Sequence, residues 1–310
     1  MNLLVTGAAG FIGSHYVLRH KERAPEDSIV VLDNLTYAAD KSFLDSIEGD
    51  ITFVEGDIAD KALVESLVEE HGIETVVNFA AETHVDRSID DIAPFIHANI
   101  EGVQSLIDVC RKHPEMLLLH VSTDEVYGDL KDGDPSFTTE SPLRPSNPYS
   151  VTKAAGDLLL RAAARTYNIR VRITRCTNNY GPHQDKSKLL PVIITNAIEG
   201  KKIPIYGEGK QKRDWLYVTD HTDAVEAVLE KGEDGKVYLI SADNELENIT
   251  VAQTVLDSLG ESQDLIEFVP DRPGHDWRYS LDSSAVRALG WEPKVSFEDG
   301  VKKTIEWYKN

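Results

Sequence analysis

Short apolar runs alternate with helix-like segments through the first half of the chain. Strands are predicted over residues 3–6, 29–33, 52–55, 75–79, 116–122 and 171–174, and helices near 12–23, 60–71, 91–112 and 150–167. This alternation predicts an α/β fold of the Rossmann type, with a doubly wound parallel sheet. The strands are almost continuously apolar, which is typical of a sheet covered on both faces.

The alternation ends after about residue 177, and Gly and Pro become frequent around 181–214. Two further strand-like pieces follow at 215–218 and 237–241, with a helix near 220–231 between them. We expect the Rossmann-type domain to cover 1–177, with returning segments at about 214–241. A smaller C-terminal domain would comprise 178–213 and 242–310.

The net charge of −21 argues against binding to nucleic acid or to anionic membranes, because both need positive surface. An anionic small substrate is compatible only if a few basic residues gather in one cleft. No apolar run reaches the length of a membrane span, and the N-terminus lacks the pattern of a signal peptide. The two cysteines form no disulfide framework or metal-ligand cluster, so we expect a cytoplasmic protein without a metal.

A glycine-rich turn, "VTGAAGFIG", follows the first predicted strand and opens a helix. Gly7, Gly10 and Gly13 allow a pyrophosphate to approach the backbone at a helix N-terminus. Asp33 lies 20 residues after Gly13, at the end of the next strand, where a carboxylate binds an adenosine ribose and repels a 2′-phosphate. The pattern predicts NAD rather than NADP; a turn that binds no phosphate is the alternative.

Two further strand ends carry residues suited to a dinucleotide. Asp57 and Ile58 are placed to flank adenine, and Ala80 and Ala81 are small enough to let the cofactor pass. Ordinary loops at strand ends remain the alternative for both segments.

The segment "PSNPYSVTKAAGD" contains Tyr149 and Lys153 four residues apart. Asn147 can cap a helix that begins at Pro148, and the spacing then places the phenol and the ammonium on one helix face. A nearby cation, helped by the positive nicotinamide, would lower the phenol pKa from about 10 and make Tyr149 a usable base.

With the glycine turn and Asp33, this pair resembles the extended short-chain dehydrogenase/reductase superfamily that acts on nucleotide sugars. The segments "HVDRSI", "STDEVYG", "RCTNNYGPHQ", "KLLP", "GKQKRDWLYVTDH" and "DRPGHDWRYSLD" resemble the dTDP-glucose 4,6-dehydratase family in particular. The resemblance runs from residue 2 to about 308. Its most specific element is Thr123-Asp124-Glu125, since epimerases and decarboxylases of the branch usually lack the acid pair.

The resemblance implies that the substrate is oxidised at C4, loses water across C5 and C6, and receives the hydride back at C6. Glu125 would be the base at C5, Asp124 the acid at C6, and Thr123 would bond the C4 hydroxyl beside Tyr149. Adjacent residues within a strand face opposite ways, whereas just beyond a strand end both carboxylates can address the sugar. Their mutual repulsion favours one protonated and one ionised member. An exposed acidic loop is the alternative.

The resemblance also implies the remaining binding residues. The expected NAD site adds Tyr149, Lys153, Phe11, Ile12, Asn34, Asn99, Ser122, Cys176 and Asn178 to the residues above. The expected nucleotide-sugar site comprises His84, Ser88, Thr123, Asn178, Lys188, Leu189, Pro204, Tyr206, Arg213, Asn248, Arg272 and His275. A single basic residue among these could instead be an ordinary solvated charge.

Some features depart from the pattern. Trp277 stands where many members carry Arg, and "GPHQDKSKLLP" contains more polar residues than usual. These departures leave open whether the substrate carries dTDP or UDP. A nucleotide-sugar epimerase or decarboxylase, or a non-catalytic NAD-binding regulator, remains an alternative. Helix 150–167 is rich in alanine, and small residues permit close helix packing. The resemblance implies a homodimer in which this helix and the 91–112 helix pair with their twins in a four-helix interface; a face buried within one chain is the alternative.

Overall fold

The computed structural model describes residues 1–271 and 275–309. Its main sheet is parallel, with the strand order β10-β6-β5-β4-β1-β2-β3. The strand order reverses between β1 and β4, which is where doubly wound sheets bind dinucleotides. The bounds are β1 Asn2–Thr6, β2 Ser28–Asp33, β3 Ile51–Glu55, β4 Thr75–Asn78, β5 Leu117–Thr123, β6 Arg170–Cys176 and β10 Val237–Ile240.

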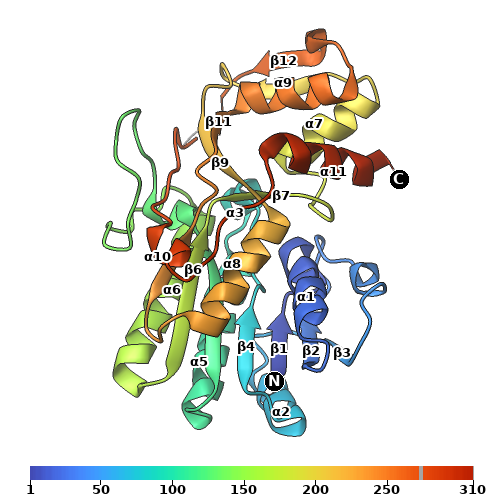
Figure 1. Ribbon diagram of the computed structural model, residues 1–310. Coiled ribbons are helices and arrows are strands. Elements are labelled where there is room, and N and C mark those ends of the chain that lie inside the picture. The colour runs from blue at the N-terminus through green and yellow to red at the C-terminus, as the bar shows by residue number, and fades with distance from the viewer. Residues whose placement is uncertain (272–274, 310) are drawn as a thin grey trace.

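Helices cover both faces of this sheet (Figure 1). On one face α1 (Phe11–Arg23) and α8 (Val218–Lys231) pack over apolar residues of the strands. On the other face α2 (Lys61–His71), α5 (Gly102–Lys112) and α6 (Pro148–Tyr167) enclose a second apolar cluster. The predicted doubly wound parallel sheet is therefore confirmed.

The helix expected over 91–112 is interrupted. It is divided into α4 (Ala93–Ile96), a π-helical turn η2 (His97–Glu101) and α5, after a short α3 (Val85–Asp90). The turn carries Asn99, whose amide donates to the Glu82 carbonyl and to Thr152 Oγ1, at 3.0 and 2.9 Å. Such π-helical turns often occur at functional sites, and this one ties the helix to the loop after β4.

The smaller part lies above the carboxyl ends of the sheet in Figure 1. Its strands form a three-stranded sheet β11-β9-β7 and a parallel pair β12-β8. Tyr180, Trp215 and Phe297 pack in its core. The bounds are β7 Asn178–Tyr180, β8 Ile203–Tyr206, β9 Lys212–Tyr217, β11 Glu245–Glu247, β12 Ile266–Val269, α7 Leu189–Ile198, α9 Asn248–Leu259, α11 Phe297–Lys309 and the 3₁₀ turn η4 Gln263–Leu265. Three short elements pack on the larger part instead: the 3₁₀ turns η1 (Lys41–Leu44) and η3 (Asp124–Tyr127), and α10 (Ser284–Arg287).

The chain crosses between the two parts more than once. Helix α8 and strand β10 return to the main sheet, whereas β9 pairs with β7 and β11. The strand at 215–217 thus lies in the smaller sheet, although the expected division placed it with the larger domain. Of the helices within the described residues, none is both long and apolar enough to cross a bilayer.

Candidate active site

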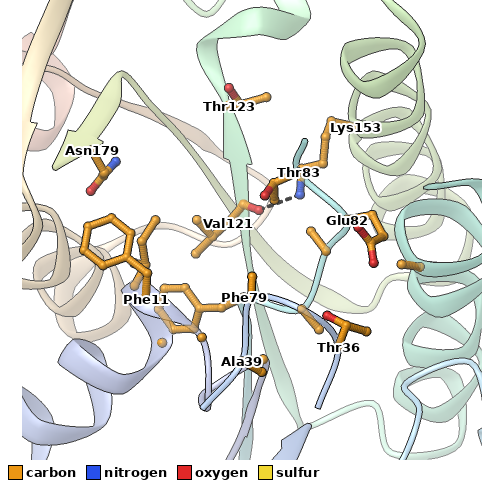
Figure 2. Close-up of a pocket in the computed structure, with 18 of the residues that line it drawn as sticks. Phe11, Thr36, Ala39, Phe79, Glu82, Thr83, Val121, Thr123, Lys153 and Asn179 are labelled. Atoms are coloured by element: carbon orange, nitrogen blue, oxygen red, sulfur yellow. Dashed lines mark hydrogen bonds between the residues drawn. The ribbon is translucent and has the colours of Figure 1, made fainter. Parts of the chain in front are cut away.

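A cleft of about 310 Å³ opens at the carboxyl ends of β1, β2, β4, β5 and β6. The glycine-rich turn forms one wall, and the strand end at Thr123 and the side chain of Lys153 lie on the opposite side (Figure 2). Asn179, from the smaller part, closes the cleft from a third side. The cleft thus brings together segments that are far apart in the sequence.

The glycine-rich turn is tightly packed. Gly7 has φ +69°, and a Cβ there would lie 2.5 Å from the Ala80 nitrogen, while one at Gly13 would lie 2.4 Å from the Gly7 carbonyl oxygen. The buried Asp33 carboxylate accepts from the amides of Ala9 and Leu35, both at 2.9 Å. Asp33 therefore holds the turn in shape as well as facing the expected ribose position.

Several polar atoms along the cleft are buried without a partner. Ser122 Oγ, Asn178 Oδ1, Asn179 Oδ1 and Gln184 Oε1 make no hydrogen bond to any described residue. Unsatisfied buried polar groups are costly and call for a ligand or water. The N-cap residue of α1 is Gly10, which has no side chain to cap the helix, so the first amides of α1 are available to a phosphate. The donor and acceptor set therefore fits NAD.

The acid pair lies directly beyond β5. Thr123 ends the strand and caps η3 by accepting from the Glu125 amide at 3.3 Å, so the backbone turns before both carboxylates. Thr123 Oγ1 donates to Asp124 Oδ1 at 3.1 Å, and Asn147 Nδ2 donates to Glu125 Oε2 at 3.4 Å. The tight turn keeps the two acids in one cleft.

The two acids differ in their surroundings. Burial raises the pKa of Asp124 well above its usual value, and the charge of Glu125 raises it further. Burial also raises the pKa of Glu125, but the cations Lys188 and Arg213 oppose that rise. Asp124 is therefore the better placed of the two to hold a proton, and Glu125 to remain ionised.

Helix α6 positions the Tyr149–Lys153 pair. Asn147 and Ser150 form a capping box, and the Tyr149 amide donates to Ser88 Oγ at 3.1 Å. Lys153 Nζ donates to the Val121 carbonyl at 2.9 Å (Figure 2), and burial lowers its pKa to about 8. Burial, followed by the charge of Glu125, raises the pKa of Tyr149 well above 10. This is opposite to the expected lowering, because burial and the carboxylate dominate the surroundings of the phenol.

Most of the expected NAD residues line the cleft. Asn99 does not; its side chain lies in η2 and bonds the backbone of Glu82. The lining residues are Gly7, Gly10, Phe11, Ile12, Gly13, Asp33, Asn34, Asp57, Ile58, Ala80, Ala81, Ser122, Tyr149, Lys153, Cys176 and Asn178.

Of the expected substrate residues, Thr123, Asn178 and Lys188 line the cleft. Arg213 lies in β9, over the Tyr279 ring, and its guanidinium donates to the carbonyls of Lys212, Asp276 and Trp277.

The other expected substrate residues lie outside the cleft lining. His84 caps α3, and Ser88 bonds the Tyr149 amide. Leu189 begins α7, Pro204 and Tyr206 lie on β8, and Asn248 begins α9. The His275 ring meets the Tyr206 ring edge-on, with centroids 6.1 Å apart. Arg272 lies outside the described residues.

The cleft also contains residues that sequence reasoning missed. Those with polar side chains are Thr36, Glu82, Thr83, Thr177, Asn179, Gln184 and Asp185. Glu82 and Thr83 lie within "NFAAETHVD", while Asn179 and Gln184 lie within "RCTNNYGPHQ". The position of these two segments could have indicated the additional cleft residues, because each segment follows a strand that ends at the cleft.

Comparisons with known proteins agree with this site. A family model described as GDP-mannose 4,6 dehydratase matches residues 4–304. The low-salt glycan biosynthesis protein Agl12 of Haloferax volcanii is 46% identical, over 99% of this chain and 98% of its own length. A dTDP-glucose 4,6-dehydratase of Streptomyces niveus is also 46% identical, over 100% of this chain and 93% of its own.

A solved structure is similarly close. The dTDP-glucose 4,6-dehydratase DesIV of Streptomyces venezuelae, solved with NAD and a thymidine nucleotide bound, superimposes with a TM-score of 0.95 at 44% identity. The match covers 100% of this chain and 97% of that one. Together with the glycine-rich turn, the Tyr149–Lys153 pair and the acid pair after β5, these matches place the chain in the dTDP-glucose 4,6-dehydratase family of extended short-chain dehydrogenases/reductases.

Proposed function

We propose that the protein is a hydro-lyase that converts dTDP-glucose to dTDP-4-keto-6-deoxyglucose and water. The observation that carries the proposal is the acid pair Asp124-Glu125, held together beyond β5 in the same cleft as Tyr149 and Lys153. An elimination between neighbouring carbons needs a base and an acid side by side, and this turn supplies both.

The chain's own groups account for the proton transfers. When bound, NAD accepts a hydride from C4 and returns it to C6, so the cofactor is not consumed. Tyr149 takes the proton of the C4 hydroxyl, and Thr123 bonds that oxygen. To act as a base Tyr149 must be ionised, which its burial and the charge of Glu125 disfavour. The cation Lys153, on the same face of α6, and the positive nicotinamide of bound NAD would oppose that effect and favour the ionised phenol.

Elimination then uses the acid pair. Glu125 removes the proton on C5, which the neighbouring ketone has made acidic, and Asp124 gives a proton to the C6 hydroxyl as it leaves as water. The surroundings support this division, because burial favours the protonated form of Asp124 while Lys188 and Arg213 favour the ionised form of Glu125. Glu125 then returns its proton to C5, which completes the product, and the proton that Tyr149 took balances the one that Asp124 gave to water.

Cations near the cleft support binding of a diphosphate. Lys188 lines the cleft, and Arg213 is near enough to lower the pKa of Glu125. We assign Asn178, Lys188, Arg213, Arg272 and His275 to the diphosphate, and Leu189, Pro204, Tyr206 and Asn248 to the nucleoside. His84 and Ser88 are assigned to the sugar. Tyr206 is partly exposed and free to stack on a base.

We also propose where the protein acts and how it assembles. It would act in the cytoplasm as a homodimer, with NAD held between turnovers.

The test is incubation of the purified protein with dTDP-glucose or UDP-glucose, followed by NMR of the sugar. We expect a 4-keto-6-deoxy product from dTDP-glucose. An epimerase would yield the C4 epimer without loss of water, and a regulator would bind NAD without turnover. Either result would overturn the proposal, and faster reaction of UDP-glucose would correct the nucleotide.

A further inference from the structure

A fully buried ion pair lies beneath the catalytic side chains. Arg175 Nε, on β6, donates to Asp157 Oδ2, on α6, at 2.8 Å, and neither side chain is exposed to solvent. Arg175 Nη1 also donates to the Tyr127 hydroxyl at 2.5 Å. The pair therefore connects α6, which carries Tyr149 and Lys153, to η3, which carries the two acids. Buried ion pairs often stabilise a fold no better than apolar residues would, so this pair suggests a functional role.

Asp157 lies on the catalytic face of α6. Tyr149, Lys153 and Asp157 follow one another at four-residue steps, which places them in line along the helix, and all three are buried. Asp157 Oδ1 makes no hydrogen bond to any described residue. His120 Nε2, on β5, lies 3.9 Å from this oxygen and also has no hydrogen-bond partner among the described residues. In such a dry environment the field of this oxygen acts over a longer range than in water.

The buried ammonium of Lys153 needs a negative charge nearby if it is to stay protonated. The hydrogen bond from its ammonium to the Val121 carbonyl replaces only part of its lost hydration. Titratable groups approach it from three elements: Asp157 on α6, Cys176 on β6 and His120 on β5. Burial raises the pKa of the Cys176 thiol to about 12 and lowers the pKa of His120 well below its usual value, so both are uncharged near neutral pH. Of the three, Asp157 is the one that forms an ion pair, with Arg175.

We infer that Asp157 is a positioning residue whose carboxylate keeps Lys153 protonated, and that Arg175 limits how much of that charge reaches the lysine. The consequence for catalysis rests on the proposed function, since a cationic Lys153 is needed beside Tyr149 during oxidation at C4. The electrostatic relation between Asp157, Arg175 and Lys153 does not depend on the substrate.

The direct test is the titration of Lys153, followed by NMR in protein labelled at lysine Cε and assigned with Lys153→Met. In the parent protein the signal should titrate near pH 8. Asp157→Asn should lower that midpoint by about one unit, as expected for loss of a nearby opposite charge. Arg175→Gln should raise the Lys153 midpoint, because the Arg175 cation no longer offsets the negative charge of Asp157. Shifts in opposite directions separate an electrostatic role from general damage; unchanged midpoints, or shifts in the same direction, would overturn the inference.

Asp157→Asn leaves Arg175 buried without its counter-ion, which could prevent folding. The double variant Asp157→Asn/Arg175→Gln removes both charges; Asn keeps the size of Asp, and Gln keeps a polar side chain at position 175. The titration midpoint of Lys153 should be lower in this double variant than in Arg175→Gln alone. Equal midpoints in the two variants would contradict the inference. Asp108→Asn, on the exposed side of α5, is the matched control and should leave the titration unchanged.

The pH profile of dehydration provides a second measurement. The loss of kcat at alkaline pH should begin at lower pH in Asp157→Asn and at higher pH in Arg175→Gln. At pH values well below this alkaline loss, Asp157→Asn should have most of the kcat of the parent protein, whereas a misfolded site would not. If the parent protein dehydrated no sugar nucleotide, the proposed function would fail while the NMR test of Asp157 remained decisive.

Discussion

Glu125 and Asp124 adjoin in sequence, yet their surroundings favour different protonation states. Asp124 is 2% exposed and receives a hydrogen bond from Thr123, while Glu125 faces Asn147 and is influenced by two cations. This difference allows two carboxyl groups to perform opposite proton transfers in one cleft.

Removing either acid should stop the reaction at a different stage. Glu125→Gln should still permit oxidation at C4 but should slow exchange of the C5 hydrogen with solvent. Asp124→Asn should retain that exchange and lose elimination. Each loss should be about 10²–10⁴-fold, as is typical for acid–base groups. Deuterium exchange at C5 by NMR, with the absorbance of reduced cofactor, measures both stages.

Tyr149→Phe is the control for this experiment, because it should block oxidation and leave both later stages without a substrate. If Asp124→Asn lost C5 exchange while Glu125→Gln kept it, the assigned roles would be reversed. If both acid variants dehydrated normally, the acid pair would be structural.

Asp33 predicts the choice of cofactor. Its carboxylate is fixed by the Ala9 and Leu35 amides and would lie beside the 2′ position of the adenosine ribose. Protein stripped of cofactor should therefore regain activity with NAD, and the NAD should not be consumed. Equal recovery with NADP, or a need for one NAD per product, would contradict this prediction.

At the scale of elements, an aromatic cluster joins three segments beside the cleft. The His183 ring, from the segment after β7, stacks on Phe43 of η1 with centroids 3.9 Å apart and contacts Trp307 of α11 edge-on. Ser14 Oγ lies 3.0 Å from His183 Nδ1, and the His15 ring lies beside it. Packing of these rings secures the loop after β2 against the smaller part.

This cluster should make stability sensitive to acid. Burial lowers the pKa of His183 to about 4, although Asp40 opposes the effect, whereas an unfolded histidine titrates near 6.5. The unfolded chain therefore binds more protons between these values, so the contribution of His183 is complete above about pH 6.5 and is lost as pH falls toward 4. His183→Gln should flatten the pH dependence of the free energy of unfolding by at most about 1.4 kcal/mol per pH unit.

Denaturant titrations from pH 7 to pH 4 measure this slope. Trp307→Phe is the matched control, because it disturbs the same cluster without removing a titrating group. It should lower stability at every pH and leave the slope unchanged. An identical slope in His183→Gln and the parent protein would contradict the argument.

At the scale of the whole molecule, exposed apolar side chains form a surface on which we expect a second copy to pack. On α6, Val151 and Leu158 are 47% and 52% exposed and lie seven residues apart, on one helix face. Ile92, the N-cap residue of α4, and Ile96, its last residue, are also exposed, and α4 packs against α6. Exposed apolar side chains gathered in this way are typical of an interface.

We expect light scattering at micromolar concentration to give the mass of a dimer. Val151→Glu/Leu158→Glu should shift the protein to a monomer, because two charges would enter the apolar interface. Phe268→Glu, on the distant strand β12, is an equally exposed control and should leave the mass unchanged. A monomeric parent protein would contradict the prediction.

Sequence reasoning was most successful where the signal was local. The strand at 116–122, the Asn147 cap and the four-residue spacing of Tyr149 and Lys153 all depend on residues close together in the chain, and the structure contains each. The continuous helix expected over 91–112 was wrong, because the π-helical turn at Asn99 follows from its bonds to Glu82 and Thr152 on other elements.

The sequence by itself determined the doubly wound sheet, the glycine-rich turn and the neighbouring acids, because periodicity and spacing specify which side chains share a face. Only the tertiary structure decided that Tyr149 has a raised pKa, that Asn179 and Gln184 close the cleft, and that Asp157 pairs with Arg175 beneath Lys153. The physical reason is that desolvation and Coulomb interactions depend on contacts between residues far apart in the chain, and these contacts form only when the chain folds.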